Sequence, residues 1–293
     1  MVKRDFPESQ GHGRSAGAVL EADAPRKARD IARFGVATVA PWEPVYEAIR
    51  ILVQKKISCL PVVRGKDVVG MVAEKDILRL LCARQFLPGL VEDYMTENII
   101  CFDVEDELTD ISDCLVENEF RSAPILYDGR LVGIISRADF IRAYQDRFRP
   151  EATAGFPKIP IAADMMACGL LTVRPETPVY DAMHILATRS VTGLPVVDSS
   201  MTLQGIISEK DVLRLLHTAA IQPGKVEDYM TRDVVSLDHD TTVLTICECL
   251  AHSNFRRVPI LREGRVVGVI SRADVILYIL RNRHAVFGHR HTD

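Results

Sequence analysis

Phe120-Arg-Ser-Ala-Pro-Ile-Leu-Tyr-Asp-Gly-Arg-Leu-Val-Gly-Ile-Ile-Ser-Arg-Ala-Asp139 is the stretch that decides the fold, because it occurs twice. It returns 135 residues later as Phe255-Arg-Arg-Val-Pro-Ile-Leu-Arg-Glu-Gly-Arg-Val-Val-Gly-Val-Ile-Ser-Arg-Ala-Asp274. The segment 91–96, Val-Glu-Asp-Tyr-Met-Thr, returns in the same way at 226–231. Self-similarity at a fixed offset is the signature of a repeat architecture. The chain is therefore a duplication.

Each half divides again into two units. Gly70-Met-Val-Ala-Glu-Lys-Asp76 precedes Gly133-Ile-Ile-Ser-Arg-Ala-Asp139 by 63 residues, and the matching stretches that end at Asp211 and Asp274 have the same spacing. The sequence thus contains four units of roughly 55–60 residues, which is too short for each to bury a large core alone. Pairing of units would cover their open sheet faces.

The third unit shows the order of elements most clearly. An apolar run at 170–173, bounded by Gly169 and Pro175, predicts a strand. Apolar residues at helical spacing predict a helix over 179–188. Two further apolar runs at 194–197 and 203–207 flank a polar turn, and a second helix is predicted from Ser208. The predicted fold class is α/β (α+β), built from tandem β-α-β-β-α units.

Composition limits the classes of function. The chain has 293 residues, 47% hydrophobic residues, a net charge of −4 and a pI near 6.1. These values predict a soluble cytoplasmic protein and give no electrostatic reason for nucleic acid or an anionic membrane as partner. No apolar stretch approaches the roughly 18–20 residues that span a bilayer. Seven cysteines without a Cys-x-x-Cys pair indicate reduced thiols rather than a disulfide framework or a metal site.

The motif Gly-h-h-[Ser/Ala]-x-x-Asp, where h is apolar, ends a predicted strand and starts a helix in all four units. One explanation is structural, because Ser-x-x-Asp is close to a helix capping box. The pairs Ser136 and Asp139, Ser208 and Asp211, and Ser271 and Asp274 all fit it. In the first unit, however, the acid Asp76 is present although Ala73 replaces the serine. That observation favours a second role for the acid.

The surroundings of the motif suit a nucleotide. A helix N-terminus offers free amides and positive partial charge to an anion. A carboxylate accepts hydrogen bonds and so suits the vicinal hydroxyls of a ribose. The planar guanidinium of arginine suits phosphate. Arginines near the motif in sequence are Arg121, Arg137, Arg256, Arg257 and Arg272.

With four copies of this unit, the chain resembles the cystathionine β-synthase (CBS) repeat family over about residues 30–282. The resemblance implies that two repeats form a pseudo-twofold Bateman module with clefts that take AMP, ADP, ATP or related adenosyl ligands. Two modules are predicted, at 26–149 (repeats about 30–86 and 90–149) and at 161–283 (repeats about 161–221 and 225–283). Residues 1–25 are predicted to be disordered, 150–160 to be a linker and 284–293 to be a tail.

The resemblance also implies roles for individual residues. The acids Asp76, Asp139, Asp211 and Asp274 should hold the ribose hydroxyls. The serines Ser136, Ser208 and Ser271 should face phosphate or ribose, and Arg121, Arg256 and Arg257 should lie in the nucleotide site. The adenine should lie against the first strand of a repeat, near Ile99 and Ile100, Leu170 and Leu171, or Val234 and Val235. It should also contact the residues around a recurring proline, at Ala123-Pro124, Leu194-Pro195 and Val258-Pro259.

Two repeats depart from this pattern. The first has Ala73 at the serine position, and Ser58-Cys59-Leu60 offers no arginine there. The third has Thr192-Gly193 where the second has Arg121-Ser122, and Glu209 where the second has Arg137. An acid repels phosphate, so the third cleft needs basic side chains from its paired repeat. We expect the clefts to differ in affinity, with the second and fourth repeats the richest in arginine.

The function predicted from these observations is a non-enzymatic regulatory sensor that binds AMP, ADP or ATP and signals to an effector protein that the sequence does not identify. The alternative is a ligand-free CBS-repeat adaptor for protein–protein interaction. No catalytic motif or metal-ligand motif is present, and no cofactor is required. Because modules of this family pack in twos as a disc, one chain with both modules is predicted to complete the disc alone, with a homodimer of discs as an alternative.

Overall fold

The structure is a computed structural model that describes residues 25–84, 89–149, 159–166, 169–189, 191–218, 224–283 and 286. Nearly all of the predicted disordered segment 1–25, the linker 150–160 and the tail 284–293 lie outside the described residues. Among the described helices, none is long and apolar enough to cross a membrane.

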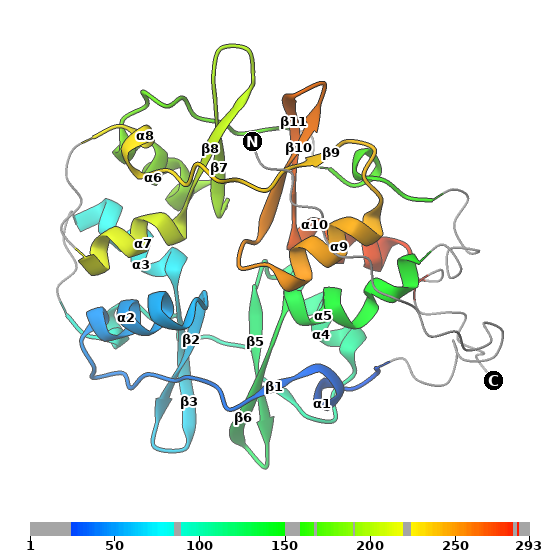
Figure 1. The fold of residues 1–293 in the computed structure, drawn as a ribbon. Coiled ribbons are helices and arrows are strands. Elements are labelled where there is room, and N and C mark those ends of the chain that lie inside the picture. Colours follow the sequence, from blue (N-terminus) through cyan, green and yellow to red (C-terminus); the bar gives the residue numbers. More distant parts are fainter. Residues whose placement is uncertain are drawn as a thin grey trace.

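All four repeats contain a helix, a β-hairpin and a second helix, in the predicted order (Figure 1). The first repeat has α2 (Val45–Lys55), β2 (Cys59–Arg64), β3 (Asp67–Ala73) and α3 (Glu74–Arg84). The second has β4 (Phe102–Asp103), α4 (Leu108–Glu117), β5 (Ser122–Tyr127), β6 (Arg130–Ser136) and α5 (Arg137–Tyr144). The third has α6 (Val179–Thr188), β7 (Gly193–Val197), β8 (Leu203–Ser208) and α7 (Glu209–Thr218). The fourth has β9 (Leu237–Asp238), α9 (Val243–His252), β10 (Arg257–Arg262), β11 (Arg265–Ser271) and α10 (Arg272–Arg281).

The first strands of the second, third and fourth repeats are shorter than predicted or displaced. The predicted strand at 170–173 is reduced to one bridge between Val173 and Val196. In the second and fourth repeats the first strands, β4 and β9, begin two residues after the apolar pairs 99–100 and 234–235. These strands pair in parallel with β5 and β10, so their position depends on a partner that is distant in sequence. The local apolar run therefore placed them wrongly.

The repeats interlock in pairs through the segments that precede them. β1 (Arg33–Phe34) precedes the first repeat but pairs antiparallel with β6 of the second, in the sheet order β1-β6-β5-β4. The segment before the second repeat crosses the first in turn: Met71 N–H donates to Thr96 O at 3.0 Å. At Gly70 a Cβ would lie 2.9 Å from Thr96 O. The glycine that opens the motif is thus required by this close crossing.

Two hydrophobic cores join the halves of the chain. One core contains buried residues of the first and third repeats, such as Ile49, Leu52 and Leu186. The other contains buried residues of the second and fourth repeats, such as Ile141 and Ile276. In Figure 1 the first two repeats form the lower half and the last two the upper half, with helices between them. One chain therefore closes both modules against each other, as the disc prediction requires.

Candidate functional site

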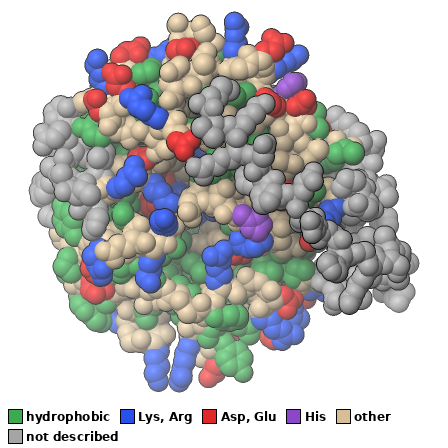
Figure 2. Space-filling model, viewed as in Figure 1, with side chains coloured by type: hydrophobic (Ala, Val, Ile, Leu, Met, Phe, Trp, Pro, Cys, Tyr) green, Lys and Arg blue, Asp and Glu red, His purple; other side chains and the backbone are tan. Residues whose placement is uncertain are grey.

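A cavity of about 850 Å³ opens where the repeats meet, and residues of all four repeats line it. Most of its charged lining residues are lysines and arginines, including Arg137, Lys210 and Arg272. Lys and Arg side chains also gather around the middle of the face shown in Figure 2. The cavity is therefore electropositive although the whole chain carries a net charge of −4.

Two of the four predicted ribose-binding acids line this cavity, Asp139 at the start of α5 and Asp274 at the start of α10. Asp76 and Asp211 do not line it. In both cavity helices the serine three residues earlier donates to Oδ2 of the acid. The Oγ–Oδ2 distance is 2.5 Å from Ser136 and 2.6 Å from Ser271. The backbone amides of the same serines donate to the same oxygens at 2.8 and 2.7 Å.

The capping role of the acids is therefore real, including in the first repeat. There the Ala73 backbone amide donates to Asp76 Oδ2 at 2.9 Å, so the acid caps the helix without a serine. The presence of Asp76 beside Ala73 therefore does not require a second role, because the backbone amide alone is a sufficient capping partner.

The acids differ in the hydrogen-bond partners of their second carboxylate oxygen, Oδ1. Asp139 Oδ1 accepts from Arg33 Nε at 2.7 Å and from Arg142 Nη2 at 2.6 Å. Burial raises the pKa of Asp139, but its hydrogen bonds from Ser136, Arg142 and Arg33 outweigh burial and lower the pKa below its ordinary value. Asp211 Oδ1 accepts from Arg214 and from Thr231 Oγ1, both at 3.0 Å. Asp274 Oδ1 has no partner among the described residues.

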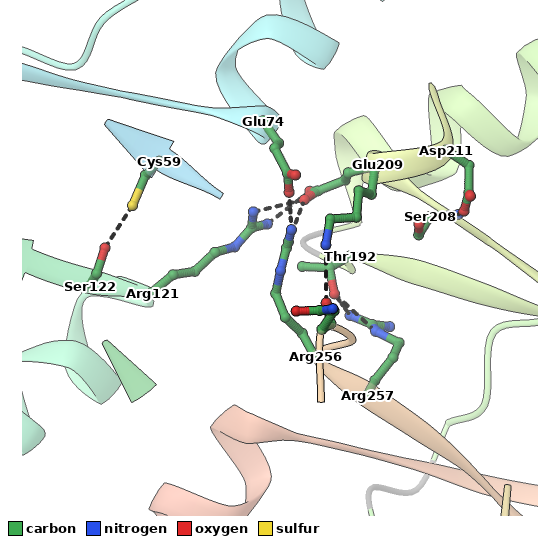
Figure 3. Close-up of polar contacts among 12 residues, drawn as sticks. Cys59, Glu74, Arg121, Ser122, Thr192, Ser208, Glu209, Asp211, Arg256 and Arg257 are labelled. Atoms are coloured by element: carbon green, nitrogen blue, oxygen red, sulfur yellow. Dashed lines mark hydrogen bonds and ion pairs between the residues drawn. The ribbon is translucent and has the colours of Figure 1, made fainter. Parts of the chain in front are cut away.

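A buried ion cluster lies beside the cavity and takes one side chain from each repeat (Figure 3). Arg121 donates to both oxygens of Glu209, with Nη1–Oε2 at 2.7 Å and Nη2–Oε1 at 2.8 Å. Arg256 donates to Glu209 Oε2 at 3.2 Å and also to Glu74 Oε2. The two glutamates are almost fully buried, at 1% and 0% exposure. Arg121 and Arg256, predicted as nucleotide ligands, thus neutralise Glu74 and Glu209.

Three other cavity arginines have no carboxylate partner among the described residues. Arg257 donates to Thr192 Oγ1 at 2.6 and 3.0 Å and to Gly193 O at 2.6 Å (Figure 3). Arg137 and Arg272 donate only to backbone carbonyls, and Arg137 Nε is buried without a partner. Burial lowers the pKa of each of the three to about 10, so they remain charged at neutral pH. None of the three donates a hydrogen bond to a carboxylate among the described residues, although Asp139 and Asp274 lie near enough to favour their charge.

The cavity brings together only part of the predicted set. It is lined by Ser136, Asp139, Ser271, Asp274, Arg121, Arg256 and Arg257. It is not lined by the predicted adenine contacts Ile99, Ile100, Ala123, Pro124, Leu170, Leu171, Leu194, Pro195, Val234, Val235, Val258 and Pro259.

Sequence reasoning missed other cavity residues, namely Arg33, Lys55, Lys56, Lys75, Arg142 and Lys210. The repeated Glu-Lys-Asp at 74–76 and 209–211 was a usable signal for Lys75 and Lys210. Arg33 gave no signal, because it reaches the cavity through a strand added to another repeat.

A family model described as the CBS domain matches residues 28–83, 91–146, 162–218 and 226–281. The chain therefore belongs to the CBS domain family.

Among its relatives, the uncharacterized protein MJ1225 of Methanocaldococcus jannaschii is 29% identical over 191 residues, which is 64% of this chain and 68% of that protein. The crystal structure of MJ1225 has a TM-score of 0.75 at 22% identity and covers 86% of this chain and 99% of its own.

Two further matches are partial. Inosine-5′-monophosphate dehydrogenase of the same organism is 33% identical over 116 residues, which is 39% of this chain but only 23% of the enzyme. The shared part is CBS sequence. The crystal structure of CBSX2 in complex with AMP is 30% identical and spans 42% of this chain and 98% of its own, with a TM-score of 0.39.

Proposed function

We propose that this protein is a non-enzymatic regulatory sensor that binds an adenine nucleotide, AMP, ADP or ATP, in the cavity between its CBS repeats. One observation carries the proposal. A single cavity combines a serine–aspartate helix start with arginines that donate no hydrogen bond to a carboxylate among the described residues. The proposed modules are the interlocked pairs at 26–149 and 161–283.

The chemistry of the cavity matches the parts of a nucleotide. A carboxylate oxygen accepts hydrogen bonds from ribose hydroxyls. The arginines offer planar donors to phosphate, and the N-termini of α5 and α10 add favourable partial charge. Isolated buried charge is costly, so an anion that neutralises Arg257 and Arg272 recovers part of that cost. The adenine ring would complete the contacts with the uncharged lining of the cavity.

The rival functions make less use of these residues. A ligand-free adaptor would leave the buried arginines of the cavity without an anion. Such an adaptor would give no reason for the arginines to lie there. For an enzyme, the hydroxyl–carboxylate pairs of the cavity, Ser136 with Asp139 and Ser271 with Asp274, are already used as helix caps. We also propose that the protein is cytoplasmic and that it signals to an effector protein, and a homodimer of discs is compatible with this arrangement.

Thermal unfolding of the full chain with AMP, ADP and ATP tests the proposal. A ligand present at about 100 times its Kd should add about 2.7 kcal/mol to the free energy of unfolding. Guanosine monophosphate and ribose 5-phosphate serve as controls for the base and for the phosphate. If no adenine nucleotide raises the unfolding temperature, the protein is an adaptor and the proposal fails.

A further inference from the structure

The two acids that line the cavity differ in what their second carboxylate oxygen can still accept. In both, Oδ2 is used by the helix cap. A ribose diol must therefore bind to Oδ1. The partners of Oδ1 decide whether Asp139 or Asp274 can serve as the ribose acid.

Asp139 has no acceptor position left. Its Oδ1 receives two charged donors, Arg33 from β1 and Arg142 from one turn later on α5. With two bonds on each oxygen and an exposure of 4%, the carboxylate is saturated. A nucleotide would have to displace an arginine from a charged hydrogen bond, which is among the stronger kinds.

Asp274 is open in the same place. Its Oδ1 has no partner among the described residues, and its side chain is partly exposed. Leu277 occupies the position on α10 that Arg142 has on α5, 135 residues earlier. Both halves of the chain therefore have the helix cap, but only the first half has an arginine, Arg142, at the position that blocks the acid.

A second, independent difference favours the same cleft. Arg257 of β10 occupies the position that Ser122 has in β5. Arg257 lies in the cavity without a carboxylate partner among the described residues, whereas the Ser122 hydroxyl is 2.8 Å from Cys59 Sγ and carries no charge. The cleft with the open acid is thus also the cleft in which a cavity arginine is held by Thr192 and Gly193, neutral partners that leave its charge available to a phosphate.

We propose that the nucleotide binds in the second half of the chain, with its ribose on Asp274 Oδ1 and its phosphate on Arg257, while Arg33 and Arg142 keep the Asp139 cleft closed. This inference rests on the proposed function. It adds that one chain has a single strong nucleotide site. It also adds that Arg33, on the N-terminal strand β1, blocks the second site at Asp139.

Calorimetry of the full chain with AMP tests this assignment. The wild-type protein should bind about one AMP per chain. Asp274→Asn should lower the affinity about ten- to a hundredfold, because a bond to a charged acceptor is lost, and Asp139→Asn should have a much smaller effect. Leu277→Arg, which copies Arg142 into the second half, should lower the affinity in the same way as Asp274→Asn.

The converse variant opens the first half. Arg33→Ala with Arg142→Leu makes the Asp139 cleft like that of Asp274 and should add a second, weaker AMP site. Circular dichroism establishes that each variant is folded, and the double variant keeps the test informative if Asp274→Asn does not fold. Wild-type protein that binds no adenine nucleotide contradicts the proposed function as well. Binding that is lost in Asp139→Asn but kept in Asp274→Asn, or a double variant with no second site, contradicts this assignment alone.

Discussion

At the scale of single residues, the glutamate–arginine cluster shows what sequence alone could not supply. The repeated Phe-Arg and Glu-Lys-Asp stretches made Arg121, Arg256, Glu74 and Glu209 visible. Which of them pair depends on how the two halves face each other, and that information is not local. The arginines were therefore predicted as phosphate ligands, although the structure pairs them with buried glutamates.

Neutralising Glu209 should destabilise the protein strongly. Glu209→Gln keeps the shape of the side chain but leaves Arg121 without a buried carboxylate partner and Arg256 with Glu74 alone, and breaking a buried pair in this way typically costs about 3–5 kcal/mol. The control is Glu227→Gln, because Glu227 is 39% exposed and lies 3.6 Å from Lys225, so it should cost less than about 1 kcal/mol. Urea unfolding measures both, and equal losses would show that the cluster does not hold the repeats together.

The Asp139 carboxylate predicts a pH dependence. Its pKa lies below the ordinary value of 3.8, so the folded state favours the ionised form. This contribution to stability is fully present above pH 3.8 and is lost as the pH falls through the lowered pKa. The difference in unfolding free energy between wild type and Asp139→Asn should therefore be larger at pH 6 than at pH 2.5. A difference that does not shrink in acid would contradict the pairing with Arg33 and Arg142.

At the scale of elements, the local signals were sufficient for the helices and hairpins. The predicted helix at 179–188 is α6, and the strands at 194–197 and 203–207 are within β7 and β8. Helical spacing and turn residues are properties of short segments, so they can be found without the fold. The first strands could not be placed correctly, since they are defined by parallel pairing with a distant hairpin.

The crossing of one repeat by its neighbour makes the motif glycine sensitive to substitution. In Gly205→Ala the new Cβ would lie 2.7 Å from Met230 Sδ and 2.8 Å from Thr231 O, so the backbone must shift. A loss of roughly 1–3 kcal/mol is expected from such overpacking. Gly193→Ala is the matched control, because its Cβ would meet nothing nearer than 3.3 Å. Thermal unfolding should show the larger loss for Gly205→Ala; the reverse order would refute the crossing.

At the scale of the whole molecule, the duplication in the sequence predicts two modules that pack against each other within one chain. The structure adds how they meet: the first repeat shares a core with the third, and the second with the fourth. This arrangement brings the Asp139 cleft and the Asp274 cleft to one cavity. The packing of modules is set by helix faces whose partners are more than 100 residues away, and no local pattern encodes it.

The shared cores predict that the halves bind each other when the chain is divided. Residues 1–150 and 157–293, co-expressed with an affinity tag on one half, should copurify as a one-to-one complex. Each half alone exposes apolar helix faces from both cores, so we expect it to be less stable or to self-associate. Two halves that behave as separate stable monomers would contradict the intrachain disc.

We propose that the cavity arginines without a carboxylate hydrogen bond bind the phosphate of an adenine nucleotide. Calorimetry with AMP, ADP and ATP should compare wild type with Arg257→Gln and Arg262→Gln, since both arginines lie on β10 but only Arg257 lines the cavity. We predict at least a tenfold loss of affinity for Arg257→Gln, from a lost charged hydrogen bond, and no change for Arg262→Gln. Equal affinities for all three proteins would show that Arg257 does not bind the phosphate, and no binding by wild type would show that the cavity is not a nucleotide site.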